Sequence, residues 1–417
     1  MSENLLTTYQ GTELSLLSTD QLDKISIIDL HTSLLVEDAE KIPTLIQKLS
    51  DEKLLALIDL SSWEKDKFSI VNFAMWLKII LSMDPKSSIR EIKRLDQQEL
   101  SLFLSNVIDV QWYDADQTYE TNPVLTPDNT FLLFPTLKDE EGKADEKFEN
   151  ELTEIANRII NVSYFDEGME LGRKICMDVM RVGQSLQEEE AYRIKNSRLA
   201  DEGIPTYVDA LELFYFEAPT KLLKKILKMA GDKQCEKSSP GYEYTISTLT
   251  VVPRSYWDSM YKFSDALLHD LQVELSALLT SSIVVNNVLD QNSKHIKEVI
   301  ERSKSYFDLG LQLIRENADI NLEELLHCVK LREIFRLGFS LLVDIKRNAG
   351  NIKVAAEALN RPDILDPDEK EFLDNLLLTI PMFQKTIDAK PVAFEKLDQL
   401  KEARKILSSI AERIVRK

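Results

Sequence analysis

The N-terminal third of this chain contains an internal repeat, which restricts its fold more than any other feature of the sequence. The stretch DAEKIPTLIQKLSDEKLLALID begins at Asp38, and the similar stretch DPKSSIREIKRLDQQELSLFLS begins at Asp84, 46 residues later. The matched apolar positions are Ile46 and Ile92, Leu49 and Leu95, Leu54 and Leu100, and Ile58 and Leu104. Each copy has apolar residues at helical spacing on both sides of a short turn, which predicts two helical hairpins of a superhelical repeat. Two amphipathic hairpins that match by chance are the alternative.

Polar residues at the ends of these hairpins predict where their helices begin. Asp84 followed by Pro85 is a favourable N-cap and first helical residue. Asp96, with Glu99 three residues later, resembles a capping box. Because two hairpins are few for a free-standing repeat array, we expect a neighbouring helix at 69–83 to cover them.

Composition favours helices along the whole chain and excludes one class of partner. Only 11 of the 417 residues are glycine, which leaves few of the tight turns that many-stranded sheets need. Acidic residues number 71 and basic ones 51, so the net charge is −20. Such a surface repels phosphate backbones, and no run of five basic residues occurs, so we expect no nucleic-acid binding.

The sequence predicts neither secretion nor insertion into a membrane. The first residues, MSEN, lack the basic and apolar parts of a signal peptide. The most apolar stretch, SIVNFAMWLKIILSM, contains Lys78 and is too short to span a bilayer. The three cysteines, Cys176, Cys235 and Cys328, are widely spaced, which is typical of reduced thiols in the cytoplasm.

Changes in the residue pattern divide the chain into three predicted domains of a mainly α protein. Residues 1–106 form the helical-hairpin repeat domain. Residues 107–137 form a small β-hairpin or ribbon, because VIDVQWYD and TFLLFPTL have strand composition and flank the turn-rich TNPVLTPDN. Residues 138–417 form a C-terminal helical bundle with a short extended segment near 240–253.

Motifs of common catalytic and cofactor-binding sites are missing from the sequence. It contains no GxGxxG after a strand, no GxxxxGK[ST], no HExxH and no GxSxG. The segment DADQTYETNPVL begins like a calcium loop but has Tyr119 and Leu125 where that loop needs glycine and glutamate. His327 and Cys328 are neighbours, and neighbours on a helix point about 100° apart, which suits a shared metal poorly. We therefore expect no catalytic residue, no metal and no cofactor.

One charged helix, predicted at 188–201 within EEEAYRIKNSRLADEGIP, carries the candidate polar site. Its members are Glu190, Arg193, Arg198 and Asp201. Glu190 can reach Arg193, and Arg198 can reach Asp201, because each pair is three residues apart. If this stripe faces inward, the four groups form a buried network that holds the fold together. If it faces outward, they form a docking surface for a partner, or a ligand or catalytic site.

Two glycines lie inside predicted helices, in YFDLGLQLI and IFRLGFSLL. Each glycine destabilises a helix by about 1 kcal/mol relative to alanine, so we expect a compensating close contact. We predict that the helices carrying Gly310 and Gly338 pack together, with one of these glycines at a tight crossing. The same region predicts separate helices at 321–348 and 351–359.

Several of these segments, in the same order, resemble the bacterial DUF6178 family, a domain of unknown function. They are LLALIDLSSWEKDKF, NTFLLFP, EEEAYRIKNSRLADEGIPTYVDALELF, YFDLGLQLI and LREIFRLGFSLL, and the resemblance extends roughly from residue 35 to residue 350. The repeat is also similar in pattern to the superhelical cytosolic domain of MgtE-type magnesium channels. The DUF6178 resemblance implies no activity and no site residues for this chain.

Three functions follow from these observations as hypotheses. The first is a non-catalytic cytoplasmic protein-binding or scaffold protein, whose acidic surface suits a partner with basic patches. The second is an enzyme or ligand-binding protein that uses the polar cluster on helix 188–201. The third is a regulatory protein that responds to divalent cations through acidic patches.

Overall fold

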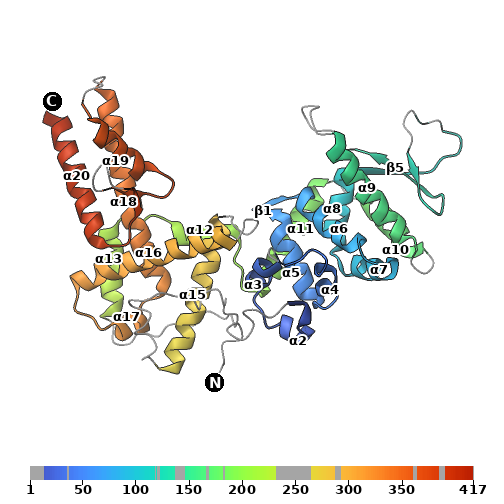
Figure 1. Cartoon of the computed structure of the whole chain (residues 1–417), viewed down its shortest axis with the longest axis horizontal. Coiled ribbons are helices and arrows are strands. Elements are labelled where there is room, and N and C mark those ends of the chain that lie inside the picture. The colour runs from blue at the N-terminus through green and yellow to red at the C-terminus, as the bar shows by residue number, and fades with distance from the viewer. Residues whose placement is uncertain are drawn as a thin grey trace. The chain divides into compact units, whose positions relative to one another are not determined.

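The computed structural model describes most of the chain, which divides into two compact units. The described residues are 14–34, 37–117, 119, 123–136, 146–165, 169–181, 184–231, 264–286, 293–359, 364–384 and 390–416. The first unit runs to Thr206 and the second begins at Tyr207, apart from short segments (Figure 1). Helices dominate both units, and the sheets are small and antiparallel, as expected for a mainly α protein.

The first unit contains the two predicted helical hairpins. The first hairpin is α4 (Ile42–Ile46) and α5 (Asp51–Ser62), and the second is α7 (Pro85–Arg94) and α8 (Gln97–Val107). All eight of the matched apolar residues are buried. Ser50 caps α5 and Asp96 caps α8, so the caps repeat at the same offset as the apolar residues. Asp84 caps α7 as predicted, with Pro85 as its first residue.

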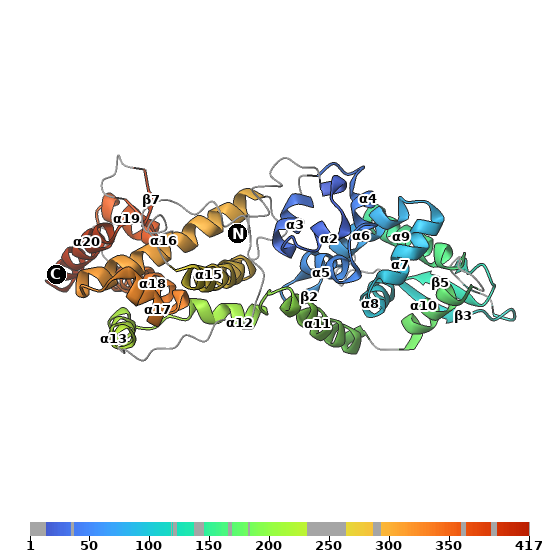
Figure 2. The same cartoon turned by 90° about the horizontal axis from the view of Figure 1, so that it is seen from below.

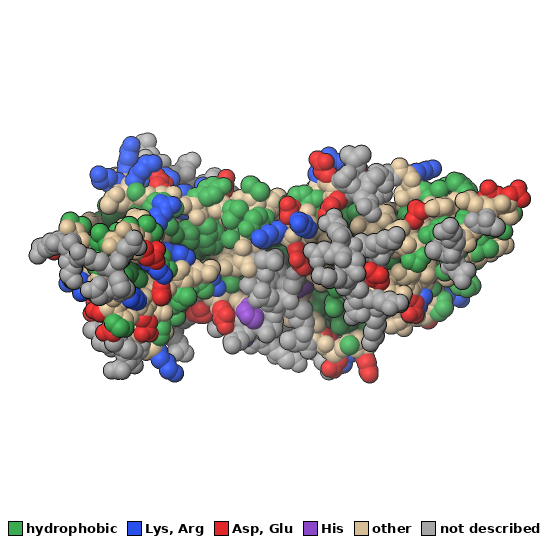
Figure 3. All heavy atoms as spheres, turned by 90° about the horizontal axis from the view of Figure 1, so that it is seen from above, with side chains coloured by type: hydrophobic (Ala, Val, Ile, Leu, Met, Phe, Trp, Pro, Cys, Tyr) green, Lys and Arg blue, Asp and Glu red, His purple; other side chains and the backbone are tan. Residues whose placement is uncertain are grey.

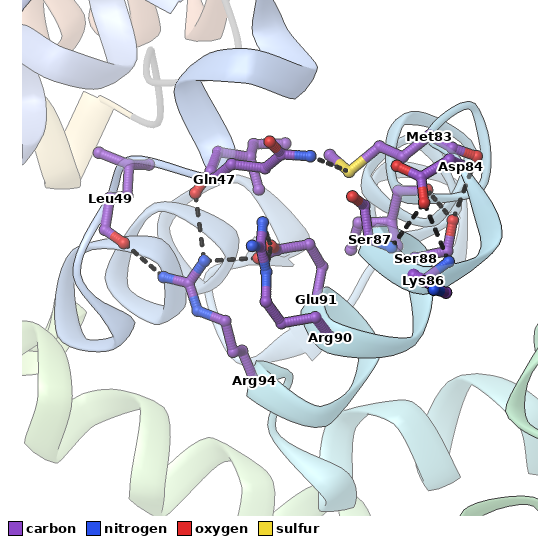
Figure 4. A network of polar contacts seen from close by, with 12 residues as sticks. Gln47, Leu49, Met83, Asp84, Lys86, Ser87, Ser88, Arg90, Glu91 and Arg94 are labelled. Atoms are coloured by element: carbon purple, nitrogen blue, oxygen red, sulfur yellow. Dashed lines mark hydrogen bonds and ion pairs between the residues drawn. The ribbon is translucent and has the colours of Figure 1, made fainter. Parts of the chain in front are cut away.

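Helix α6 (Ile70–Leu81) packs against both hairpins, in the position expected for the covering helix. Arg94 joins the two copies directly, as Figure 4 shows. Its guanidinium donates to the carbonyl oxygens of Leu49 at 2.5 Å and Ile46 at 3.2 Å. Ile46 is the last residue of α4 and Leu49 lies just after it, so an arginine of the second copy binds the helix end of the first.

Before the hairpins, a short 3-10 helix η1 (Leu14–Leu16) leads into helices α2 (Thr19–Leu22) and α3 (Ile27–Leu34). A short β-hairpin of β1 (Trp63–Glu64) and β2 (Lys67–Phe68) links α5 to α6. The predicted β insertion is present as β3 (Ile108–Trp112), β4 (Val124–Leu125) and β5 (Phe131–Pro135). Strand β5 lies in the middle of this antiparallel sheet.

Three helices complete the first unit: α9 (Glu146–Ser163), α10 (Glu170–Arg181) and α11 (Gln184–Asp201). Helix α11 contains the predicted polar cluster and packs against α5 and α8. It ends where the sequence predicts, because Gly203 has a φ of 75°, a conformation that favours glycine. The Ile204 amide then donates to the Leu199 carbonyl oxygen at 2.8 Å and closes the helix end.

The second unit is a helical bundle around the long helix α18 (Leu331–Ala358). Helices α19 (Pro367–Leu377) and α20 (Leu397–Arg416) pack along it (Figure 1). Strands β6 (Met382–Phe383) and β7 (Val392–Ala393) come between these two helices in the sequence. The remaining elements are α12 (Tyr207–Leu211), η3 (Glu212–Phe214), α13 (Pro219–Ala230), α15 (Asp265–Asn286), α16 (Ser293–Asn317) and α17 (Leu322–Cys328).

The two mid-helix glycines lie face to face, which confirms the predicted tight crossing of α16 and α18. A methyl group built on Gly338 would overlap the carbonyl oxygen of Tyr306 and lie 2.9 Å from the amide nitrogen of Gly310. A methyl group built on Gly310 would overlap the carbonyl oxygen of Ile334. Only glycine lets two helical backbones approach this closely.

Two expectations from the sequence, one about helix ends and one about the cysteines, are wrong, and a third cannot be compared with the structure. The expected helix 321–348 is broken at Val329 and Lys330, whereas the expected break at 349–350 is absent because α18 continues to Ala358. Cys328 is in a disulfide, so the three cysteines are not all reduced thiols, although Cys176 is free and buried. The extended segment expected near 240–253 lies outside the described residues. No helix in the described part of the chain has the length and apolarity needed to cross a membrane.

Candidate functional site

Helix α11 brings only one of the four predicted site residues into the interior. Arg198 has 19% of its side chain exposed and points toward α5 and α8. Arg193 is 80% exposed and lies 3.8 Å from Glu190, so this predicted pair is present but weak. Asp201 is also exposed. The ion pairs of Arg198 with described residues go to other helices rather than to Asp201.

Arg198 is the centre of a buried ionic cluster that joins three helices. Its Nε and Nη2 donate to the two carboxylate oxygens of Asp59, at 2.7 and 2.8 Å. Its Nη1 donates to Asp96 at 2.5 Å, and its Nη2 lies 3.6 Å from Glu99. Burial alone would lower the pKa of Arg198, but hydrogen bonds and the charge of Asp59 raise it. The guanidinium therefore stays charged and clamps α5 and α8 to α11.

Glu99 lies at the edge of the same cluster, where its surroundings favour the protonated carboxyl group. It is fully buried, and burial raises its pKa well above the ordinary value, with the charge of Asp59 and a hydrogen bond to that carboxylate acting in the same direction. Its Oε1 accepts a hydrogen bond from the Trp63 indole at 2.9 Å. The capping box expected from Asp96 and Glu99 is therefore half formed, because Asp96 caps α8 while Glu99 binds Trp63 instead.

Lys195 covers the aromatic side of the cluster. Its Nζ lies 5.3 Å from the centre of the Trp63 ring and 4.9 Å from that of Tyr192, and it donates to the Lys65 carbonyl at 3.2 Å. Burial lowers the pKa of Lys195 to about 8, although the negative charge of Asp59 acts in the opposite direction. The aromatic faces offset part of the desolvation of this ammonium group.

Two further contacts hold α11 in place beyond the cluster. The Nζ of Lys53 lies 2.6 Å from Glu202, and both side chains are largely buried. The amide of Phe68 donates to Glu188 at 3.3 Å, which fixes the β1–β2 turn beside the start of the charged stretch. Through these contacts, the charged stretch holds α11 against the rest of the first unit. A ligand site formed by its exposed residues, Glu190, Arg193 and Asp201, stays a prediction.

Sequence reasoning missed the partners of Arg198, because they lie far away along the chain. Asp59 and Asp96 precede it by 139 and 102 residues. One signal was present: Asp59 interrupts the apolar run LLALIDL, and an acid inside such a run must find a partner when it is buried. The described residues hold no group of three or more histidine, cysteine or acidic side chains arranged for a metal ion.

The surroundings of Glu99 give a testable contrast with those of Glu91, another fully buried glutamate. Glu91 is ion-paired, with Arg90 at 2.7 Å and Arg94 at 2.5 Å. We expect Glu99→Gln to keep or raise the free energy of unfolding at pH 7, because the amide reproduces the acceptor for Trp63 and the donor for Asp59. We expect Glu91→Gln to lower the free energy of unfolding by about 2–4 kcal/mol, because it replaces the carboxylate that binds two arginines with a neutral amide whose NH2 group cannot accept from them. Urea unfolding followed by tryptophan fluorescence measures both.

The pH dependence of this contrast has a fixed sign. A group whose folded pKa is raised contributes stability that is lost as pH rises above its unfolded value, which is 4.5 for Glu99. The advantage of Glu99→Gln over the natural protein should therefore grow as pH increases above 4.5. An advantage that shrinks over this range would show that Glu99 is ionised in the folded state.

Both outer strands of the β3–β5–β4 sheet carry exposed apolar side chains. On β3, Trp112 is 56% exposed and Tyr113 directly after it is also exposed, whereas the exposed Val124 and Leu125 belong to β4 on the other side of β5. Residues 108–137 include acidic residues but no lysine or arginine. Strand β3 pairs with a described strand on one side only. In Figure 3, hydrophobic side chains reach the surface between charged ones on the face shown.

Backbone pairing shows which groups of β3 point away from the sheet. The Tyr113 amide donates to the Thr130 carbonyl oxygen, and Gln111 pairs with Leu132. Because inward and outward groups alternate along an antiparallel strand, the amides of Val110 and Trp112 point outward. We call the outward side of β3, with Trp112, Tyr113 and the exposed Asp109 and Asp116, the β3 edge.

Comparison with known proteins gives one match. The model of DUF6178, described as a family of unknown function, matches residues 28–413, which include both units. No curated protein matches the chain, and no solved structure matches it. Because the match covers nearly the whole chain, this protein belongs to the DUF6178 family.

Proposed function

We propose that this protein is a non-catalytic binding protein whose partner docks an extended, basic segment along the β3 edge. The observation that carries the proposal is a short edge strand with outward amides, exposed aromatic side chains and acidic neighbours. Edge strands accept an added strand through main-chain hydrogen bonds, and side chains on either side select the partner.

Charge supports a basic partner. Asp109 and Asp116 are exposed near the β3 edge, and no cation occurs in residues 108–137 to neutralise them. Opposite charges on a partner would speed association and fix its orientation. The same charge distribution, within a net charge of −20, disfavours nucleic acid as the partner.

The buried polar groups of α11 support a non-catalytic role. Arg198 donates hydrogen bonds to Asp59 and Asp96, and Glu99 accepts one from Trp63, so these groups already have partners within the protein. A cytoplasmic location is part of the same proposal. The free Cys176 agrees with that location, whereas the disulfide at Cys328 does not.

Site-specific cross-linking tests the proposed partner. A photo-reactive amino acid at Gln111, on β3, should capture a segment rich in lysine or arginine, identified by mass spectrometry. The same group at Glu52, an exposed residue of α5, should not capture it. A synthetic peptide of the captured segment should bind the purified full chain, and binding should weaken with added salt.

Two charge-reversed variants complete the test. Asp109→Lys with Asp116→Lys should weaken peptide binding about tenfold, since close charge pairs contribute on the order of 1.4 kcal/mol or more. Glu52→Lys with Glu64→Lys changes the net charge equally and should leave binding unchanged. A captured segment without basic residues, or an equal loss in both variants, would contradict the proposal.

A further inference from the structure

The second unit contains a pocket of about 430 Å³ that the polar cluster of the first unit does not share. It lies among α12, η3, α15 and the first turns of α18, and Figure 2 shows α12 beside α15. This volume is within the range of small-molecule sites. Leu213, Ala277 and Leu278 give the pocket an apolar wall.

Charged side chains of both signs line the rest of the pocket. Lys330, Arg332 and Arg336 come from the beginning of α18, whereas Asp209, Glu212 and Glu274 come from α12, η3 and α15. Glu274 already accepts the Leu331 amide at 2.7 Å, so this acid is held in place by the helix it faces. A pocket lined by both cationic and acidic side chains suits a ligand that carries both charges.

Arg336 lines the pocket and has unused hydrogen-bonding capacity. Its side chain is 18% exposed, and its Nε is buried without a hydrogen-bond partner among the described residues. Its ion pairs with Glu217 and Glu333 are both 3.8 Å long, outside hydrogen-bonding range. A buried guanidinium donor without a partner is unfavourable, and a carboxylate or phosphate accepts from it in the planar two-bond geometry.

The acidic wall decides between these two anions. Asp209 and Glu212 would repel a phosphate dianion but would attract an ammonium group. We propose that the pocket binds a small zwitterion of the amino-acid type, with its carboxylate on Arg336, its ammonium group toward the acids and its side chain on the apolar wall.

Calorimetric titration of the full chain tests this ligand class. The probes are L-leucine and the other proteinogenic amino acids, with 4-methylpentanoate, 3-methylbutylamine and inorganic phosphate as analogues that lack one feature. At least one amino acid should bind with a Kd below roughly 1 mM. The analogue that lacks the ammonium group and the one that lacks the carboxylate should each bind about tenfold more weakly or worse.

Variants of α18 locate the binding. Arg336→Met should weaken amino-acid binding about tenfold or more. Arg336→Lys should also weaken it, because lysine keeps the positive charge but cannot donate two parallel hydrogen bonds to one carboxylate. Glu333 also pairs with Lys225, at 3.2 Å, so it keeps an ion-pair partner when Arg336 is replaced. If Arg336→Met does not fold, Arg336→Lys alone tests the site. Lys353→Met on the same helix, remote from the pocket lining, should leave binding unchanged.

Three results would overturn the inference. The first is that no amino acid binds with a Kd below roughly 1 mM. The second is that phosphate or 4-methylpentanoate binds as tightly as the best amino acid, because the ammonium group would then contribute nothing. The third is that Arg336→Lys and Arg336→Met bind as tightly as the natural protein.

Discussion

Replacing Gly338 by alanine should unfold the second unit or loosen its centre. The added methyl group would overlap the carbonyl oxygen of Tyr306, which is backbone and cannot rotate away. Helices α16 and α18 would have to separate, and overpacking of this kind lowers the free energy of unfolding by about 3 kcal/mol or more. Hydrogen exchange followed by mass spectrometry should show lost protection in peptides from both helices.

The same helix provides a matched control. A methyl group on Gly350 would meet only the Cδ2 atom of Leu377, at 3.6 Å, which is ordinary contact. Gly350→Ala should therefore leave stability unchanged or raise it by about 0.5–1 kcal/mol, because alanine favours the helix. Equal losses in the two variants would mean that glycine itself, rather than the crossing, explains the effect.

Replacing Arg198 by alanine should destabilise the first unit by about 3–5 kcal/mol. The change would leave Asp59, which is fully buried, without the guanidinium that binds both of its oxygens. An unpaired buried carboxylate is far less favourable than a paired one. Urea unfolding followed by the fluorescence of Trp63 and Trp76 reports on this unit, because both indoles lie inside it.

Arg193→Ala is the control for this prediction, because it removes an arginine from the same helix. Arg193 is 80% exposed and its pair with Glu190 is long, so stability should change by no more than about 0.5 kcal/mol. Arg198→Lys should lie between the two, because lysine keeps the charge but loses the two-bond geometry. A loss for Arg193→Ala as large as that for Arg198→Ala would contradict the assignment of Arg198 as the clamp.

Local pattern was sufficient wherever neighbouring residues decide the structure. The caps at Asp84 and Asp96, and the end of α11 shortly before Gly203, follow from contacts within a few residues. The strand composition of residues 107–137 likewise predicted the small sheet. The glycines of α16 and α18 were informative because their unfavourable position in a helix required a compensating contact.

Local pattern failed where a distant residue decides the structure. The Leu331 amide at the start of α18 is satisfied by Glu274 of α15, and nothing near Leu331 in the sequence indicates this. The same helix continues through Gly350, because its packing against α19 outweighs the weak helix propensity of one glycine. The candidate site was incomplete for the same reason, since Asp59 and Asp96 are far from Arg198 in the sequence.

By itself, the sequence determined the helical class, the two hairpins with their matched buried residues, and the crossing at Gly310 and Gly338. Helix periodicity and backbone sterics act over a few residues, so they can be read directly from the chain. Only the tertiary structure decided that Arg198 turns inward while Arg193 stays in water, and that Arg336 lines a pocket and leaves its buried Nε without a partner among the described residues. The physical reason is that the state of a charged side chain depends on burial and on partners from other helices, which the order of residues does not specify.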